Sequence, residues 1–263
     1  MALFEFELRD LGEIAPWETS KGPSLSWFAL TDGHFRMPVG NEVLFEYTEA
    51  VQSHLKLEDP RVDYQIASIA RDMLECLMPA IMKMPPRVER LASDWNKLRQ
   101  LQKATEALDE NDESWDLTYN AWRWLGERSP WTSYFVSNPR FTFVRVRDEV
   151  RIHWDNRGLE IDGITAWTAQ TGVHVLPVTA FIDECRSFSN RLLIQMAQRV
   201  DLLESGSAKA QVPVNIESLR EQHDSWKAEL ETYFKERDTD LSWQETEHAL
   251  CAAAEKTALG SLE

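Results

Sequence analysis

Near the start of the chain, apolar and polar residues alternate, and this period of two predicts strands. The segment FEFEL (4–8) has the alternation of a strand with one buried face. SLSWFAL (24–30), HFRMPV (34–39) and EVLFEY (42–47) also have strand character, and the turn sequences TDG and GN separate them. We therefore predict a small antiparallel meander in this part of the chain.

The apolar period then lengthens to three or four residues, which predicts helices. One helix is expected over residues 62–84, ending at Pro85-Pro86, and a second over residues 88–108. The acidic stretch DENDESWD (109–116) is expected to turn the chain into a third helix. Helices joined by such brief breaks pack antiparallel. The pattern therefore predicts a helical insertion over about residues 60–126.

Strand character returns in RFTFVRVRDEVRIHW (140–154), which predicts a hairpin. A three-residue turn at 147–149 separates an apolar face from an Arg-rich face, whereas a two-residue turn places arginines opposite apolar residues. The longer turn is therefore predicted. ITAWTAQ (164–170) and VHVLP (173–177) are expected to form a second hairpin around Thr171-Gly172.

The last part of the chain has helical periodicity throughout. A long helix is predicted over residues 181–203, followed by the linker SGSAKAQ (205–211). A further helix is expected over residues 216–234, with Asn215 as its N-cap, and a final one over about residues 242–259.

Together these elements predict an α+β fold. Its antiparallel sheet is built from the N-terminal meander and the central pair of hairpins, with the helical insertion and the C-terminal helices packed against it. The predicted division is a core domain of residues 1–204 and a C-terminal helical segment of residues 212–263 that packs on the core.

The composition narrows the field of partners. The chain has 44 acidic and 28 basic residues, a formal net charge of −16, which disfavours binding to nucleic acid. The three cysteines are far apart and odd in number, so no disulfide framework is predicted. The acidic, alternating N-terminus is unlike a signal peptide, and no apolar run approaches the length of a membrane span. We therefore expect a cytoplasmic protein with no membrane partner.

No catalytic or cofactor signature is present. The chain lacks GxSxG, phosphate-binding glycine loops and HExxH, so no catalytic residue, cofactor or metal is assigned. His153 and His174 fall on neighbouring predicted strands, and with Asp155 or Asp162 they could form a two-histidine, one-carboxylate metal site. Two histidines on the surface of a sheet are the favoured interpretation.

A polar cluster in residues 151–177 offers the main candidate binding residues. In the structural interpretation, Asp155-Asn156 and Asp162-Gly163 form turns and Arg157 pairs with a nearby carboxylate. In the functional interpretation, the loops form a rim that contacts a partner or ligand. With TDGH (31–34), the candidate binding residues are Asp32, His34, His153, Asp155, Arg157, Asp162 and Gln170.

Three long stretches resemble an uncharacterised bacterial family. They are FEFELRDLGEIAPW (4–17), SLSWFALTDGHF (24–35) and the block at 153–188. Members of the family share the corresponding patterns FxFxLRxLxxIxPW, SWFxLTDG and WDNR…DG…WTAxxG. The resemblance covers most of residues 1–200 and implies no activity. In character, such small acidic proteins are similar to immunity proteins or antitoxins that bind bacterial toxins.

The leading hypothesis is a non-enzymatic, acidic protein-binding module, and specifically an immunity protein that neutralises a toxin with a basic domain. One alternative is an enzyme or small-ligand binder whose polar pocket is formed by the TDGH and HWDNR loops. Another is a structural subunit, for example a homodimer, whose interface is formed by four aromatic residues of the C-terminal helices: Trp226, Tyr233, Phe234 and Trp243.

Overall fold

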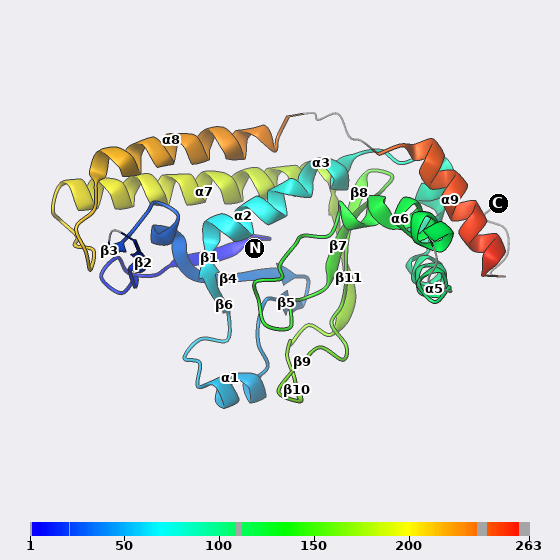
Figure 1. Cartoon of the computed structure of the whole chain (residues 1–263), viewed down its shortest axis with the longest axis horizontal. Helices are drawn as coiled ribbons and strands as arrows, with labels where there is room; N and C mark the ends of the chain where they lie inside the picture. The colour runs from blue at the N-terminus through cyan, green and yellow to red at the C-terminus, as the bar shows by residue number, and fades with distance from the viewer. Residues whose placement is uncertain (1, 21, 109–111, 236–240, 258–263) are drawn as a thin grey trace.

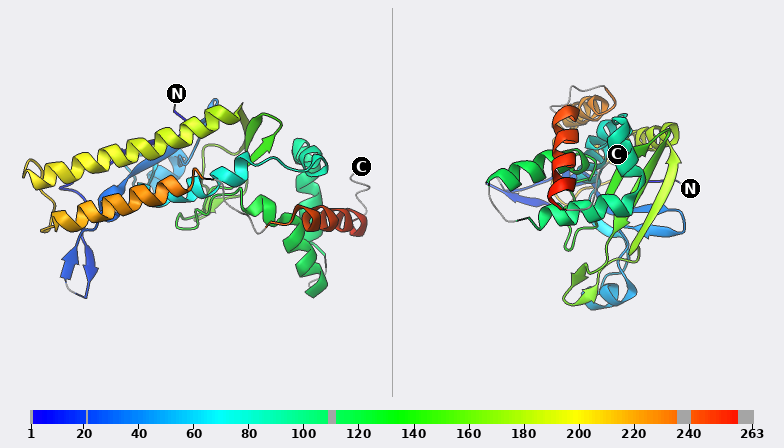
Figure 2. Two further views of the ribbon diagram at one scale, coloured as in Figure 1. Left: turned by 90° about the horizontal axis from the view of Figure 1, so that it is seen from above. Right: turned by 90° about the vertical axis from the view of Figure 1, so that its right-hand side faces the viewer.

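The computed structural model describes residues 2–20, 22–108, 112–235 and 241–257. The fold is α+β, as the sequence predicts, and it is elongated (Figure 1). Two long antiparallel helices run along one half of the molecule beside the first of two antiparallel sheets, the second sheet lies near the middle, and a group of shorter helices lies at the other end (Figure 2).

The first sheet is organised around its central strand, β4 (Asp32–Val39). Strand β1 (Glu5–Leu8) pairs along one edge of β4, while β5 (Glu42–Leu44) and β6 (Val62–Gln65) share the other edge. Alternation along β4 buries Phe35 and leaves its neighbours on the opposite face partly exposed.

The prediction of a strand at residues 24–30 and a turn at TDG is wrong. Residues Ala29–Thr31 form the 3-10 helix η1, and Asp32 and Gly33 already belong to β4. The preceding residues are held by helix packing, since Trp27 and Phe28 both stack on Trp226. A short hairpin of β2 (Trp17–Thr19) and β3 (Gly22–Ser24) projects nearby (Figure 2). Contacts with a distant helix therefore override the local strand pattern.

The helical insertion is more broken than predicted. After α1 (Glu49–Leu55), the first four residues of the predicted helix form β6, and the remainder is divided at Cys76. Pro79 explains the division, because its ring clashes with the carbonyl of residue 75 in a continuous helix. Asp94 likewise divides the second predicted helix by capping the amide of Lys97. The resulting helices are α2 (Ile66–Glu75), α3 (Leu77–Ile81), α4 (Pro86–Ser93) and α5 (Trp95–Glu106).

The third predicted helix is confirmed as α6 (Asp112–Gly126). The expected turn at 109–116 begins in residues 109–111, which lie outside the described residues.

The second sheet has the strand order β11-β8-β7, with β7 (Phe141–Val146), β8 (Glu149–Asp155) and β11 (Thr171–Pro177). Strand β11 pairs with β8, so the predicted pairing of residues 164–170 with 173–177 is wrong. Residues 160–165 instead form the small hairpin of β9 (Glu160–Ile161) and β10 (Ile164–Thr165). Its turn at Asp162-Gly163, where both residues have positive φ, confirms the predicted turn signal.

The predicted three-residue turn between β7 and β8 is also wrong. Val146 pairs with Glu149, which leaves a two-residue turn and places Arg145 opposite Val150. The mixed pairs are tolerated because both faces of the sheet are covered at β7 and β8. Arg145 donates to the carbonyl of Ile81, at the end of α3, and Arg151 to the carbonyl of residue 93, at the end of α4. The predicted Arg-rich face is therefore absent, since this register places Arg145 and Arg151 on opposite faces of the sheet, where each contacts the end of a different helix.

Three helices complete the chain: α7 (Val178–Glu204), α8 (Ile216–Thr232) and α9 (Trp243–Lys256). Helix α7 packs one face of the second sheet, where Phe181 meets Phe143, and α8 runs antiparallel beside it (Figure 1). Helix α9 packs against α6 at the far end. Asn215 caps α8 as predicted. Residues 258–259 of the final predicted helix lie outside the described residues, and the division into residues 1–204 and 212–263 stays a prediction.

Two apolar cores follow from this arrangement. The larger core joins the first sheet, α2, α7 and the inner face of the second sheet. The smaller core lies on the other face of the second sheet, where Val144 and Val146 meet α4, α5, α6 and α9. Arg128 helps to hold α9 there, because its guanidinium lies over the rings of Trp124 and Trp243. Strands β7 and β8 of the second sheet are thus covered on both faces.

Candidate functional site

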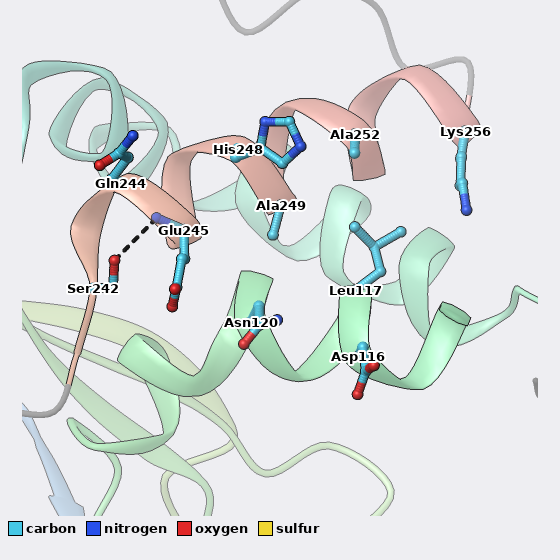
Figure 3. Close-up of a pocket in the computed structure, with 10 residues that line it drawn as sticks. All are labelled: Asp116, Leu117, Asn120, Ser242, Gln244, Glu245, His248, Ala249, Ala252 and Lys256. Atoms are coloured by element: carbon cyan, nitrogen blue, oxygen red, sulfur yellow. Dashed lines mark hydrogen bonds between the residues drawn. The ribbon is translucent and has the colours of Figure 1, made fainter. Parts of the chain in front are cut away.

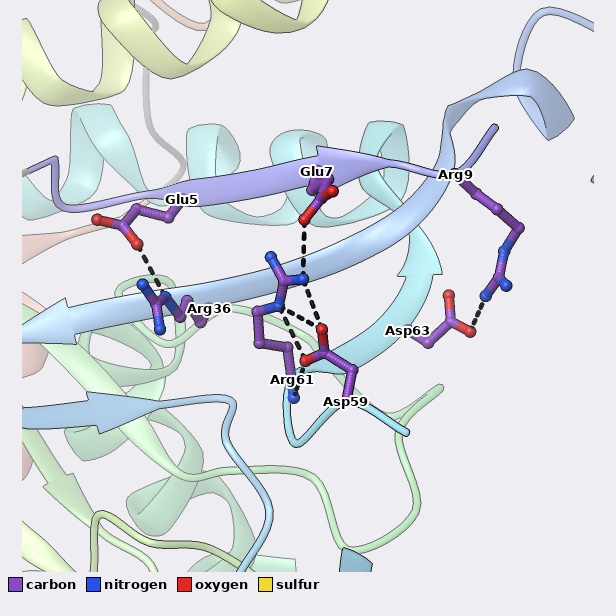
Figure 4. Close-up of polar contacts among 7 residues, drawn as sticks. All are labelled: Glu5, Glu7, Arg9, Arg36, Asp59, Arg61 and Asp63. Atoms are coloured by element: carbon purple, nitrogen blue, oxygen red, sulfur yellow. Dashed lines mark hydrogen bonds and ion pairs between the residues drawn. The ribbon is translucent and has the colours of Figure 1, made fainter. Parts of the chain in front are cut away.

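The outer face of the first sheet carries a dense set of charged side chains (Figure 4). The alternation that sends Phe35 into the core sends Asp32, His34 and Arg36 to this side, and cross-strand partners on β1 and β6 point the same way. We call this surface the charged face. It consists of Glu5, Glu7, Arg9, Asp32, His34, Arg36, Asp59, Arg61 and Asp63.

Each arginine of the charged face connects different strands or loops. The Nε atom of Arg9 lies 3.1 Å from Asp32 Oδ2, and the same guanidinium also pairs with Asp63 of β6. Arg36 of β4 lies 2.8 Å from Glu5 of β1. The burial of Asp32 and the negative charge of Asp63 raise the pKa of Asp32, against the opposing effect of Arg9.

Arg61 is the most heavily engaged cation of the charged face. Its guanidinium donates to both carboxylate oxygens of Asp59, at 2.9 and 3.0 Å from Nε, and to Glu7 Oε2 at 2.9 Å. The hydrogen bonds from Arg61 lower the pKa of Asp59 to about 2, and those same bonds raise the pKa of Arg61. Asp59 is therefore ionised throughout the neutral range.

Two carboxylates, those of Glu7 and Asp63, lie outermost in the two clusters bridged by Arg61 and Arg9. The side chains of Glu7 and Asp63 are 69% and 44% exposed, whereas those of their partners Arg61 and Arg9 are 21% and 28% exposed. A molecule that approaches the two bridged clusters therefore meets negative charge first, and the positive charges beneath hold the carboxylates in place.

Other arginines are directed into the protein, so the surface is more acidic than simple counting suggests. Five of them donate to main-chain carbonyls, and none of the five is fully exposed. They are Arg128, Arg145, Arg151, Arg191 and Arg199.

The loop residues among the candidates of the 151–177 cluster pair within the cluster or with helix α1. Asp155 and Arg157 pair with each other at 2.8 Å, and this contact lowers the pKa of Asp155. Asp162 lies 3.0 Å from His54 Nε2, and Gln170 donates to the carbonyl of Trp167 at 2.6 Å. These contacts fit the structural interpretation of the cluster.

Asn156 is the central residue of this cluster, and the sequence does not indicate its burial. It is fully buried, its Oδ1 accepts from the amide of Arg140 at 2.7 Å, and its Nδ2 donates to the carbonyl of Ala169 at 2.9 Å. The side chain thus joins two segments that enter and leave the loop. An Asp-Asn pair signals a turn, but nothing in the sequence alone predicts these two distant partners.

The two histidines of the proposed metal pair point to opposite faces of the second sheet. His153 pairs with Val173 and His174 pairs with Ile152, so the alternation of the strands separates the two rings. Among the described residues, no group of three His, Cys, Asp or Glu side chains could hold a metal. The hydrogen bonds and ion pairs of these described residues also do not connect Asp32 or His34 with the 151–177 cluster.

His153 is a buried residue and not a surface histidine of the sheet. Its ring stacks on Trp95 with centroids 3.9 Å apart and planes within 7°. Burial, aided by the charge of Arg151, lowers the pKa of His153 to about 4.

This shift predicts a loss of stability in acid. The folded protein favours neutral His153, so its contribution is complete above pH 6.5 and is lost as pH falls from 6.5 towards 4. We expect His153→Phe, which keeps a ring against Trp95, to reduce the loss between pH 7 and pH 4 by about 2–3 kcal/mol. Urea unfolding of both proteins at the two pH values measures this. An unchanged pH dependence in the variant contradicts it.

A pocket of about 610 Å³ lies between α6 and α9, away from the candidate residues (Figure 3). It carries carboxylates from Asp116 and Glu245, the imidazole of His248 and the amine of Lys256. The sequence does not predict it, because it exists only where two helices from distant parts of the chain pack together.

No helix of the described ranges is both long and apolar enough to cross a membrane.

Comparison with curated proteins and with solved structures gave no match. A family model does match, and it spans residues 3–249. The match includes both sheets, the charged face, α8 and the first half of α9. It therefore extends beyond the stretches on which the resemblance in the sequence was based. The chain belongs to this family, the family of unknown function DUF5984.

Proposed function

We propose that this protein is a non-enzymatic, acidic protein-binding module, an immunity protein that neutralises a bacterial toxin with a basic domain. The charged face is its proposed binding surface. The observation that supports this choice is the layering of that face, in which exposed Glu7 and Asp63 lie above the better-covered Arg61 and Arg9.

Charge on the protein affects both the rate of encounter with a basic partner and the stability of the complex. A net charge of −16 attracts a basic protein over long distance and raises its association rate. The carboxylates are already fixed by arginines, so little side-chain freedom is lost when lysines or arginines of the partner arrive. The charged face therefore offers a preorganised acidic surface.

The proposal places the protein in the cytoplasm, where its three free cysteines would stay reduced. The alternatives have less support. The TDGH and HWDNR residues do not form a common pocket through the contacts of the described residues. The four aromatics suggested for a homodimer interface pack within the chain: Trp226 on Trp27, Tyr233 in the large core, Phe234 under Arg186, and Trp243 near Trp124.

The test is binding to the protein encoded by the neighbouring gene, measured as association rate at rising NaCl concentration. We expect the rate to fall with salt. The double variant Glu7→Gln, Asp63→Asn should lower it by about threefold to tenfold at low salt, since two outermost negative charges are removed. The matched control is Glu217→Gln, Glu221→Gln, which removes the same charge from the exposed surface of α8.

The control should change the rate by less than about twofold. An equal effect of both double variants would show that the charged face is not the binding surface. An interaction insensitive to salt, or no binding, would contradict the proposed function itself.

A further inference from the structure

Strand β11 (Thr171–Pro177) forms a free edge of the second sheet. It pairs with β8 along its whole length, and no other strand of the described chain pairs with it. Figure 2 shows β11 at the margin of this sheet. An unpaired edge presents main-chain donors and acceptors to any strand that approaches.

The pairing register of β11 with β8 shows which main-chain N–H and C=O groups of β11 point away from β8. The amide of Asn156 donates to the carbonyl of Gln170, which makes this a hydrogen-bonded pair. Because such pairs alternate in antiparallel strands, Gly172, His174 and Leu176 also face β8. The N–H and C=O groups of the residues between them, Thr171, Val173 and Val175, therefore point outward, and no hydrogen bond from the described residues reaches them.

The side chains of β11 do not protect this edge. Val173 and Val175 are 51% and 43% exposed, and they lie on the same face of the strand. The sequence TGVHVLP contains no Lys, Arg, Asp or Glu, and its proline stands at the last position. Charges, internal prolines and bulges are the usual means by which edge strands avoid pairing. The edge therefore has the properties of a docking strand.

We propose that β11 pairs antiparallel with β11 of a second copy of this chain, about a two-fold axis at Val173. Val173 then pairs with its own copy and Thr171 pairs with Val175 of the second copy, so all outward N–H groups of these residues find acceptors. This arrangement gives on the order of six main-chain hydrogen bonds and brings the exposed valines of both copies together.

The absence of charged side chains on β11 allows a second copy to dock at this place. Two copies of net charge −16 repel each other, and β11 is a strand on which they can meet without opposing charged side chains. Strand pairing alone buries less surface area than a standard protein–protein interface, so the dissociation constant of the dimer should be on the order of micromolar. Added salt should tighten the dimer by screening the repulsion, which is the opposite of the salt dependence expected for a basic partner.

The test is sedimentation velocity of the full chain over a range of protein and NaCl concentrations. We expect a reversible dimer of twice the 30.5 kDa mass that forms more readily at higher salt. Val173→Pro removes an outward N–H without removing a hydrogen bond to β8, so the dissociation constant should rise at least about tenfold. The matched control Val173→Thr keeps the N–H and a β-branched side chain, and should change the constant by less than about threefold.

Circular dichroism establishes that each variant is folded. If Val173→Pro does not fold, Val175→Lys places a charge at the same edge and should weaken the dimer to a similar extent. A chain that is monomeric at all concentrations and salt levels would overturn the proposal, as would a dimer that both edge variants leave unchanged. The inference does not rest on the proposed function, because toxin binding and self-association are measured separately.

Discussion

Gly33→Ala is expected to destabilise the protein by about 3 kcal/mol or more, measured by urea unfolding. A Cβ atom at this position would lie 2.3 Å from the carbonyl oxygen of Glu7 and within 3 Å of the backbone of Leu8. The obstacle is main chain and not a flexible side chain. Strand β1 must therefore move away from β4, and the ion pair between Arg9 and Asp32 is disturbed with it.

Gly126→Ala is the matched control. This glycine ends α6, its φ is not in the left-handed region, and an added Cβ meets nothing within 4 Å. We expect no loss of stability and a gain of up to about 1 kcal/mol, because alanine reduces the freedom of the unfolded chain. Equal stability of Gly33→Ala and the wild type would show that β1 does not approach β4 as closely as the structure has it.

The second large effect is expected for Asn156→Ala, with a loss of about 2–4 kcal/mol in the free energy of unfolding. The change removes both hydrogen bonds of the side chain and leaves the amide of Arg140 and the carbonyl of Ala169 without this partner. The loop between β8 and β11 then loses its internal support.

Arg157→Ala is the control for this prediction, since it changes the adjacent residue of the same WDNR sequence. Arg157 is exposed and pairs only with Asp155 among the described residues, so its loss should leave the free energy of unfolding nearly unchanged. Comparable losses in the two variants would contradict the structural role assigned to Asn156. The pair of measurements thus distinguishes support of the loop from surface chemistry.

Elements with a long, unambiguous period could be predicted from the sequence. The predicted helix over 181–203 agrees closely with α7, and the strand at 34–39 agrees with most of β4. Residues 62–65 could not be assigned this way, because Val62 and Ile66 fit the helical spacing whether or not a strand precedes the helix. Pairing with β4 decides that choice, and pairing is not visible in local periodicity.

The predicted length of the turn between β7 and β8 was wrong for a related reason. A three-residue turn separates apolar from basic side chains onto opposite faces of the hairpin. Such a separation is expected for a sheet with one face exposed to solvent. In this protein α3 and α4 end against the sheet and their last carbonyls accept from Arg145 and Arg151. The charged face could not be predicted from the sequence either. Arg61 and Glu7 are distant in the chain, and only the pairing of the strands brings them together.

The close approach of the N-terminal segment to α7 has a consequence for synthesis of the chain. The amide of Leu3 donates to Glu184, and Arg191 and Arg199 donate to the carbonyls of Phe4 and Arg9, across separations of more than 180 residues. On the ribosome, the segment made first must wait for these partners from α7 to emerge. A bulky tag fused directly before residue 3 would compete with that late docking step, so a tag on a flexible linker is the better choice for producing the protein.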